Sequence, residues 1–314
     1  MEAQSFQDYK ILAEQGDAAA QYNLGLCYYE GNGVTQSYTE ALKWWRKSAE
    51  QGHDYAQFAI GVVYHEGELV PQSYSEAKRW WHMAAEQGDA DIQYKVAIVY
   101  LYGEGVQSYT ESAKWCRKAA EQNIADAQHL FGEFCYHGLG VIQNHKEAAM
   151  WYRKAAEQGH RQAQIELAEC YYDGKGVAQS FTEAVRWFRK AANQGEAMAQ
   201  KRLGACYSKG EGVTQNLVEA ARWYRKAAEQ GLIEAQLLFG VCYHYGNGVT
   251  QNTTEAMKWF LKAAEQGSPD GQFFIGVYYC ELGKYAEAIY WLSKAGKQGV
   301  EEAKHMLNDL GVNW

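Results

Sequence analysis

The chain has 314 residues, of which 47% are hydrophobic, and its 38 acidic and 30 basic residues give a net charge of −8. This acidic balance argues against a generic nucleic-acid binder, because such a protein needs a basic stripe on its surface. No apolar run approaches the roughly 18 residues of a membrane span, and Met1-Glu-Ala-Gln-Ser-Phe6 does not resemble a secretory leader. We therefore expect a cytoplasmic protein, with the bacterial periplasm or secretion left open if a leader was removed from the expressed chain.

One motif recurs along the whole chain. Its Glu-Gln-Gly ending places glycines mostly 36 residues apart, at Gly16, Gly52, Gly88, Gly159, Gly195, Gly231, Gly267 and Gly299. At the missing step, Asn123 follows Glu121-Gln122, and asparagine is the next-best residue for a left-handed helix terminus. A period of this length indicates a solenoid built from stacked repeats.

Each repeat predicts two helices, here called helix A and helix B. In the first repeat, helix A begins near Asp17 and ends at Gly31, because glycine tolerates the positive φ of a helix exit. Helix B opens with Ser37 and Glu40, which form a capping box: the hydroxyl caps a backbone N–H and the Glu side chain reaches back. The box recurs at Ser73/Glu76, Ser108/Glu111, Asn144/Glu147, Ser180/Glu183, Asn216/Glu219 and Asn252/Glu255.

Helix B carries a tryptophan at one position in every repeat. We expect these indoles in the core, at Trp44, Trp80, Trp115, Trp151, Trp187, Trp223, Trp259 and Trp291. The adjacent Trp45 and Trp81 are candidates for a second surface on helix B. Lys47, near the negative end of the helix dipole, is expected to pair with a local Glu.

The seven cysteines occur about one per repeat, and Cys27, Cys170, Cys206 and Cys242 share one helix A position. Equivalent residues in stacked helices lie roughly 8–10 Å apart, whereas a disulfide needs Cα atoms within about 7 Å. The sequence therefore predicts small buried side chains and no disulfides.

No catalytic, cofactor or metal constellation is found. The Gly-x-Gly loops lack the third glycine of a phosphate-binding turn and follow a helix, so they are interpreted as structural turns. His65-Glu66 is followed by Leu69 where a second zinc-binding His would stand, and for His129, His137 and His145 no carboxylate or Cys is expected at ligand spacing in a fixed geometry. We expect neither an enzyme nor a cofactor.

The segments Ala20-x-x-x-Leu24-Gly-x-x-Tyr28, Gly31-x-Gly-Val and Glu40-Ala-x-x-Trp44 resemble Sel1-like repeats, relatives of the tetratricopeptide repeat. The resemblance implies an all-α, right-handed α/α solenoid of eight helix pairs with terminal capping helices. It also implies one continuous domain over 1–314: an N-terminal capping helix in 1–16, eight repeats in 17–299 and a C-terminal capping helix in 300–314. A cysteine-rich branch of this family pairs two cysteines inside each repeat. This chain lacks that pairing, so neither the branch's disulfides nor its claimed hydrolysis of small amides carries over.

The resemblance further implies that helix A lines a concave groove, which positions 22, 26, 29 and 30 and their equivalents would face. The candidate partner-binding residues are Tyr22, Tyr29, Phe58, His65, Tyr94, Leu101, Tyr102, His129, Glu133, Tyr136, His137, Glu169, Tyr172, Asp173, Lys201, Lys209, His244 and Tyr245. Two interpretations stay open. The strip either completes packing between helices A, or presents aromatic anchors with a charged centre that sets register.

The family's usual work implies a non-enzymatic protein–protein interaction scaffold or adaptor that binds a partner protein or peptide in the groove. Bacterial immunity, adaptor and host-factor-binding roles are all compatible with it, and so is a monomer. The alternative is a carbohydrate or envelope-polymer binder in which Tyr29, Tyr136 and Tyr172 stack on sugar rings. A small-amide hydrolase is a third hypothesis, which no nucleophile–base pair supports.

Overall fold

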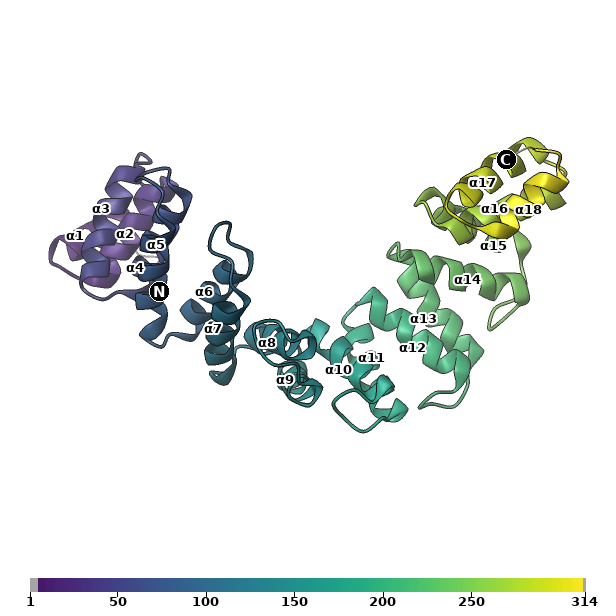
Figure 1. The fold of residues 1–314 in the computed structure, drawn as a ribbon, viewed down its shortest axis with the longest axis horizontal. Helices are drawn as coiled ribbons and strands as arrows, with labels where there is room; N and C mark the ends of the chain where they lie inside the picture. The colour runs from purple at the N-terminus through teal and green to yellow at the C-terminus, as the bar shows by residue number, and fades with distance from the viewer. Residues whose placement is uncertain (1–4, 313–314) are drawn as a thin grey trace. The chain divides into compact units, whose positions relative to one another are not determined.

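The computed structural model describes residues 5–312, and the outermost parts of the two predicted caps, 1–4 and 313–314, lie outside the described residues. These described residues form eighteen helices and no strand (Figure 1). The terminal helices are α1 (Phe6–Glu14) and α18 (Glu301–Asp309). The A helices are α2 (Ala18–Glu30), α4 (Asp54–Glu66), α6 (Ala90–Tyr102), α8 (Ala125–His137), α10 (Arg161–Asp173), α12 (Ala197–Lys209), α14 (Ile233–Tyr245) and α16 (Pro269–Glu281). The B helices are α3 (Tyr38–Glu50), α5 (Tyr74–Glu86), α7 (Tyr109–Glu121), α9 (His145–Glu157), α11 (Phe181–Asn193), α13 (Leu217–Glu229), α15 (Thr253–Glu265) and α17 (Tyr285–Lys297).

The helices group into two compact units, unit 1 (Met1–His160) and unit 2 (Arg161–Trp314). In both units each helix A packs against the helix B that follows it, and within each unit consecutive hairpins pack on one another. The predicted all-α solenoid of helical hairpins is confirmed. The predicted boundaries of a single domain over 1–314 stay a prediction.

Helix B begins at the predicted caps, but by a different arrangement from the expected box. The hydroxyl of Ser37 accepts a hydrogen bond from the backbone N–H of Glu40, as predicted. The backbone N–H of Ser37, however, already donates to the carbonyl of Tyr28 at 2.9 Å. Because that donor is taken, Glu40 pairs instead with Lys43, three residues on. The predicted return bond from Glu is therefore wrong at this helix.

The Gly-x-Gly turns connect helix A to helix B within a repeat. The first glycine of the turn follows helix A with a positive φ, 78° at Gly31. At the end of helix B, where the other repeats have a glycine, Asn123 has a similar φ of 71°. The second glycine approaches the preceding helix B: a Cβ on Gly140 would overlap the carbonyl group of Tyr109, and one on Gly212 would overlap that of Phe181. Two constraints therefore select this glycine, a positive φ and a close backbone contact.

The residue after the repeated tryptophan is the deeper one. Trp45 is only 4% exposed, and its indole N–H donates to the carbonyl of Tyr22 at 3.2 Å. Its ring fills the space over Gly25, where a Cβ would overlap it. Trp81 repeats this arrangement over Gly61. The hypothesis that Trp45 and Trp81 mark a second surface is wrong, because both rings belong to the core.

The repeated tryptophan itself lies nearer the surface than expected in half of the repeats. Trp115, Trp151, Trp187 and Trp223 are buried, whereas Trp44, Trp80, Trp259 and Trp291 are half-buried. The ammonium group of Lys47 lies 4.1 Å from the centroid of the Trp44 ring, one helical turn away. The expected pairing of Lys47 with Glu is thus replaced by a cation–π contact. The same contact forms at Lys154/Trp151, Lys190/Trp187, Lys226/Trp223 and Lys262/Trp259.

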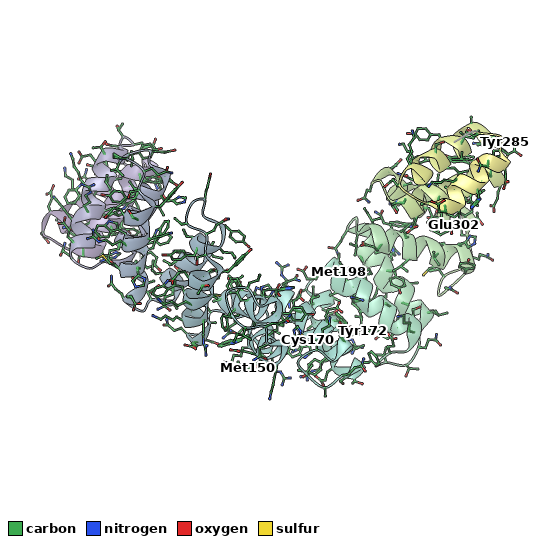
Figure 2. All side chains as sticks on the ribbon, viewed as in Figure 1. Met150, Cys170, Tyr172, Met198, Tyr285 and Glu302 are labelled. Atoms are coloured by element: carbon green, nitrogen blue, oxygen red, sulfur yellow. The ribbon has the colours of Figure 1, made fainter. Side chains whose placement is uncertain are left out.

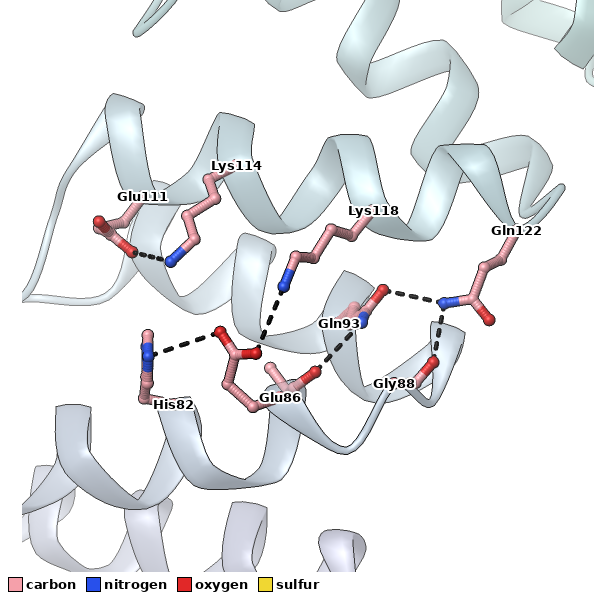
Figure 3. A network of polar contacts seen from close by, with 9 residues as sticks. His82, Glu86, Gly88, Gln93, Glu111, Lys114, Lys118 and Gln122 are labelled. Carbon is pink, nitrogen blue, oxygen red and sulfur yellow. Dashed lines mark hydrogen bonds and ion pairs between the residues drawn. The ribbon is translucent and has the colours of Figure 1, made fainter.

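A buried glutamine on helix A holds the repeats in register. Gln93 donates to the carbonyl of Ala85 in the preceding repeat at 3.1 Å and accepts from Gln122, after helix B of its own repeat, at 3.0 Å (Figure 3). The buried glutamines stand at one position in all eight repeats: Gln21, Gln57, Gln93, Gln128, Gln164, Gln200, Gln236 and Gln272. A buried amide without a hydrogen-bond partner destabilises the folded state. The two hydrogen bonds of such a glutamine therefore fix the relative position of the helices that they connect.

Candidate functional site

In repeats 1 to 3, two of the candidate residues pack against neighbouring rings and two more are half-buried. The ring of Tyr22 stacks on that of His53 at 5.0 Å, and the ring of Phe58 lies 6.4 Å from that of Trp81. Tyr94 and Leu101 are half-buried, and burial raises the pKa of Tyr94 to about 12. For these residues the arrangement accords with the packing interpretation.

His65 connects repeat 2 to repeat 3. Its Nε2 lies 2.9 Å from the carbonyl of Glu104, which can only accept, so the ring donates a proton from this nitrogen. The ring also lies 5.6 Å from both Tyr74 and Trp81. Its hydrogen-bonding edge is thus turned toward the next repeat.

In repeat 4 the candidates form a polar cluster around Glu133. The hydroxyl of Tyr152 donates to this carboxylate, and the imidazoles of His129 and His137 lie 4.0 and 3.6 Å from it. The ring of His129 stacks on that of His160 at 4.6 Å. Burial, and then the charge of His160, lower the pKa of His129, whereas Glu133 and Asp126 oppose this shift.

Tyr136, also in repeat 4, lies between two histidines. Its ring centroid is 5.0 Å from that of His137 and 4.8 Å from that of His145. His137 is exposed, whereas Tyr136 and His145 are half-buried.

In unit 2 two candidates are fixed by partners from the next repeat. Glu169 pairs with Arg202 at 2.6 Å, and burial raises the pKa of its carboxyl while the positive charge of Arg202 offsets part of this rise. Tyr172, on α10 beside Cys170 (Figure 2), donates to Glu211 at 2.6 Å, and this hydrogen bond raises its pKa to about 12. These contacts join repeat 5 to repeat 6.

The remaining candidates of unit 2 lie in repeats 5 to 7. Lys201 is half-buried, and Asp173 and Lys209 are exposed, with Lys209 lying 3.8 Å from Glu211. His244 is half-buried and its Nδ1 lies 2.5 Å from the hydroxyl of Tyr278 in the next repeat.

The last residue of helix A is exposed in all eight repeats and varies strongly. This column reads Glu30, Glu66, Tyr102, His137, Asp173, Lys209, Tyr245 and Glu281. Tyr102 and Tyr245 are the most open of its aromatic residues, with 70% and 65% of their surface exposed. The buried glutamine column is invariant over the same repeats, so the two columns separate what holds the stack together from what faces outward.

Some of these candidates belong to an edge where helix A ends and helix B begins, and their partners on helix B were not predicted from the sequence. Here Tyr29 lies 5.2 Å from Tyr38, and in unit 2 Tyr172 lies 5.1 Å from Phe181. We call the unit 1 members the aromatic edge: Tyr29, Tyr38, His65, Tyr74, Leu101, Tyr109, Tyr136 and His145. The signal in the sequence is an aromatic residue directly after the helix B cap.

The described residues include potential metal-ligating side chains and thiols. Within residues 5–312, no group of three or more His, Cys, Asp or Glu side chains is placed to hold a metal ion. All seven cysteines are free, and burial raises the pKa of Cys206 and of Cys242 to about 11. A buried thiol of this kind stays protonated at neutral pH and is a poor nucleophile.

Comparison with known proteins assigns the fold to a family. The Sel1 repeat family model matches eight consecutive segments, 18–53, 54–89, 90–124, 125–160, 161–196, 197–232, 233–268 and 269–300. The chain belongs to the Sel1 repeat family. Members of this family typically mediate protein–protein interaction and are generally non-enzymatic scaffolds. None of the curated proteins matches this Sel1 repeat chain.

Two crystal structures resemble this Sel1 repeat protein over nearly its whole length. A protective antigen present in uropathogenic Escherichia coli strains, which displays an SLR fold, is 35% identical, with a TM-score of 0.86 over 98% of this chain and 67% of the antigen. A Sel1 repeat protein from Oxalobacter formigenes is 33% identical, with a TM-score of 0.82 over 97% of this chain and 89% of that protein. Among residues 5–312, none of the Sel1 repeat helices has the length and apolarity that crossing a membrane requires.

Proposed function

We propose that this chain is a non-enzymatic adaptor that binds a partner protein or peptide segment along the exposed ends of its A helices. The observation that carries the proposal is the contrast between the invariant buried glutamines and the variable exposed residue at the end of each helix A. In a stack of repeats, residues fixed in every copy maintain the junctions. Exposed residues that differ from copy to copy can distinguish one partner from another.

Tyr102 and Tyr245 are the proposed anchors. Binding energy at interfaces concentrates in a few residues, among which tyrosine is enriched. Both side chains are the last residues of A helices, on α6 in unit 1 and on α14 in unit 2, and both are largely exposed. Glu169 is a poorer probe of this surface, because it already pairs with Arg202 and its loss would disturb that contact.

The test is affinity capture from an extract of the native host, with captured proteins quantified by mass spectrometry. Tyr102→Ala and Tyr245→Ala are each expected to lower capture of a given partner about tenfold, the effect of losing roughly 1.4 kcal/mol. The matched control is Tyr290→Ala, which removes a tyrosine that is 53% exposed on helix B of repeat 8. Circular dichroism should show equal helicity in all variants.

The control is expected to capture the partner as the wild type does. Equal capture by wild type, Tyr102→Ala and Tyr245→Ala would remove the proposal. An equal loss in all three variants would place binding elsewhere on the surface.

A further inference from the structure

Two turns in unit 1 depart from the Gly-x-Gly-Val-x-Gln pattern. In repeat 2, Leu69 replaces the second glycine, and in repeat 3 the turn from Gly103 to Gln107 is one residue shorter. In repeats 4, 6 and 7 the second glycine packs closely on the preceding helix B, as Gly140 does on Tyr109. A leucine side chain cannot take that place. In the shorter repeat 3 turn, Gly105 packs on the ring of Tyr74, whereas Gly140 packs on the backbone of Tyr109. Both departures therefore change how a turn meets the helix before it.

A hollow is present on the aromatic edge at each irregular turn. The hollow at the repeat 2 turn has a volume of about 40 Å³ and is lined by Tyr29, Tyr38, Val63, Glu66, Glu68 and Leu69. The one at the repeat 3 turn has a volume of about 180 Å³ and is lined by Tyr100, Leu101, Gln107, Ser108 and Tyr109. Only the first combines aromatic rings with carboxylates.

The lining of the repeat 2 hollow includes two tyrosine rings and two carboxylates. The ring centroids of Tyr29 and Tyr38 lie 5.2 Å apart, and Gln36 braces both residues by donating to the Tyr29 carbonyl and the Tyr38 hydroxyl. Burial, followed by the charges of Glu66, Tyr38 and Glu68, raises the pKa of Tyr29. Across residues 5–312, neither Glu66 nor Glu68 forms a salt bridge.

The sequence segments that form the aromatic edge near this hollow contain acidic residues but no Lys or Arg. The segments 24–42, 54–77 and 96–113, which form the edge in repeats 1 to 3, contain no Lys or Arg, but they carry Glu30, Glu66, Glu68 and Glu104. Two turns of unit 2 differ, since Lys175 lies in the repeat 5 turn and Lys209 directly precedes the repeat 6 turn. The acidic aromatic surface is thus a property of unit 1.

We propose that this hollow receives the cationic head of a lysine or arginine from a basic segment of a partner protein. The inference rests on the proposed function and names the chemistry of the partner. A cation is attracted to the face of a tyrosine ring, and a carboxylate beside it adds a charge-assisted hydrogen bond. About 10–15 Å³ of such space holds one water-sized group, so 40 Å³ suits an ammonium or guanidinium group. Glu30 and Glu104 would meet further cations along the edge.

The experiment measures binding of fluorescein-labelled twelve-residue peptides to the full chain by fluorescence anisotropy. The three probes alternate glycine with lysine, arginine or glutamate. The two cationic peptides are expected to bind, more weakly as salt is raised, and the glutamate peptide is not. Glu66→Gln with Glu68→Gln should weaken cationic binding at least about fivefold. The matched control, Glu157→Gln with Glu265→Gln, makes the same change in net charge at exposed helix B ends and should weaken it less than about twofold.

A second pair of variants isolates the aromatic ring. Tyr38→Leu keeps apolar surface but removes the ring and should weaken cationic binding, whereas Tyr38→Phe keeps the ring and should bind as the wild type does. Absence of cationic binding, equal losses in the two double variants, or full binding by Tyr38→Leu would each overturn the inference. A partner captured equally by wild type and the Glu66→Gln, Glu68→Gln variant would also remove it, while leaving the adaptor function in place.

Discussion

At the scale of single residues, two histidines combine partial burial with stacking on a neighbouring ring. His129 in repeat 4 is half-buried and stacks on His160. His53 is likewise half-buried and stacks on Tyr22. Burial lowers the pKa of both histidines from the ordinary value of 6.5. Their neutral forms therefore belong to the folded state.

These two histidines predict how stability depends on pH. Because the folded pKa is lowered, the unfolded chain binds more protons below about pH 6.5, so this contribution to stability is present above that pH and is lost as pH falls through the folded pKa. The free energy of unfolding, measured by urea titration at about pH 7, 6 and 5, should decline. His129→Gln should make the decline shallower, while His305→Gln, at an exposed site on α18, serves as the control. An unchanged decline in His129→Gln would contradict the assignment.

At the scale of elements, the turn between helices A and B is also the contact between repeats. The second glycine of the turn packs on the first residue of the preceding helix B, as at Gly140 and Tyr109. Gly159, at the end of helix B, has a positive φ of 92°, but a Cβ added to it would meet open space among the described residues. The two glycines separate backbone strain from close packing.

Alanine substitutions at these glycines should differ in cost. Gly159→Ala carries only the strain of a positive φ, about 1–2 kcal/mol. Gly140→Ala carries the same strain and also displaces the Tyr109 backbone, so it should cost about 1–3 kcal/mol more. Thermal or urea unfolding of the two variants gives the comparison directly. Equal losses would show that the contact between turn and helix yields without cost.

The sequence was sufficient for the helices, their ends and their period, because capping residues and glycines act locally. The sequence predicted Trp44 as the core residue because its position recurs in every repeat. The burial of a side chain depends on the neighbouring helix, however, and Gly25 provides the space for Trp45. The sequence also predicted that Glu40 accepts a hydrogen bond from the backbone N–H of Ser37, but that N–H donates to the carbonyl of Tyr28 on helix A. The helix B partners on the aromatic edge were missed for the same reason, since Tyr29 and Tyr38 meet only after the turn is folded.

At the scale of the whole molecule, the predicted single solenoid over 1–314 has a consequence for unfolding. Stability in a repeat stack is approximately the sum of repeat terms and nearest-neighbour terms. If all eight repeats form one cooperative stack, a loss in one repeat is felt along the chain. If 5–160 and 161–312 unfold separately, it is not.

Leu203→Ala tests this proposal, because Leu203 is fully buried on α12 and its truncation should cost about 2–5 kcal/mol. Native-state hydrogen exchange with peptide-level mass spectrometry reports the loss of protection in each part of the chain. For one continuous solenoid, protection should fall in peptides from 5–160 as well as in those from 161–312. A loss confined to 161–312 would divide the chain into two folding domains.

The buried glutamines also bear on how such a chain changes length over evolutionary time. Gln57 donates to Ala49 and accepts from Gln87, and Gln93 repeats both bonds with Ala85 and Gln122. Since these junctions use the same donor and acceptor, duplicating or deleting one whole repeat leaves no glutamine amide without a hydrogen-bond partner. An insertion of any other size in these helices would leave a buried amide without its hydrogen-bond partner. Recombination that adds or removes one complete repeat therefore costs the least stability.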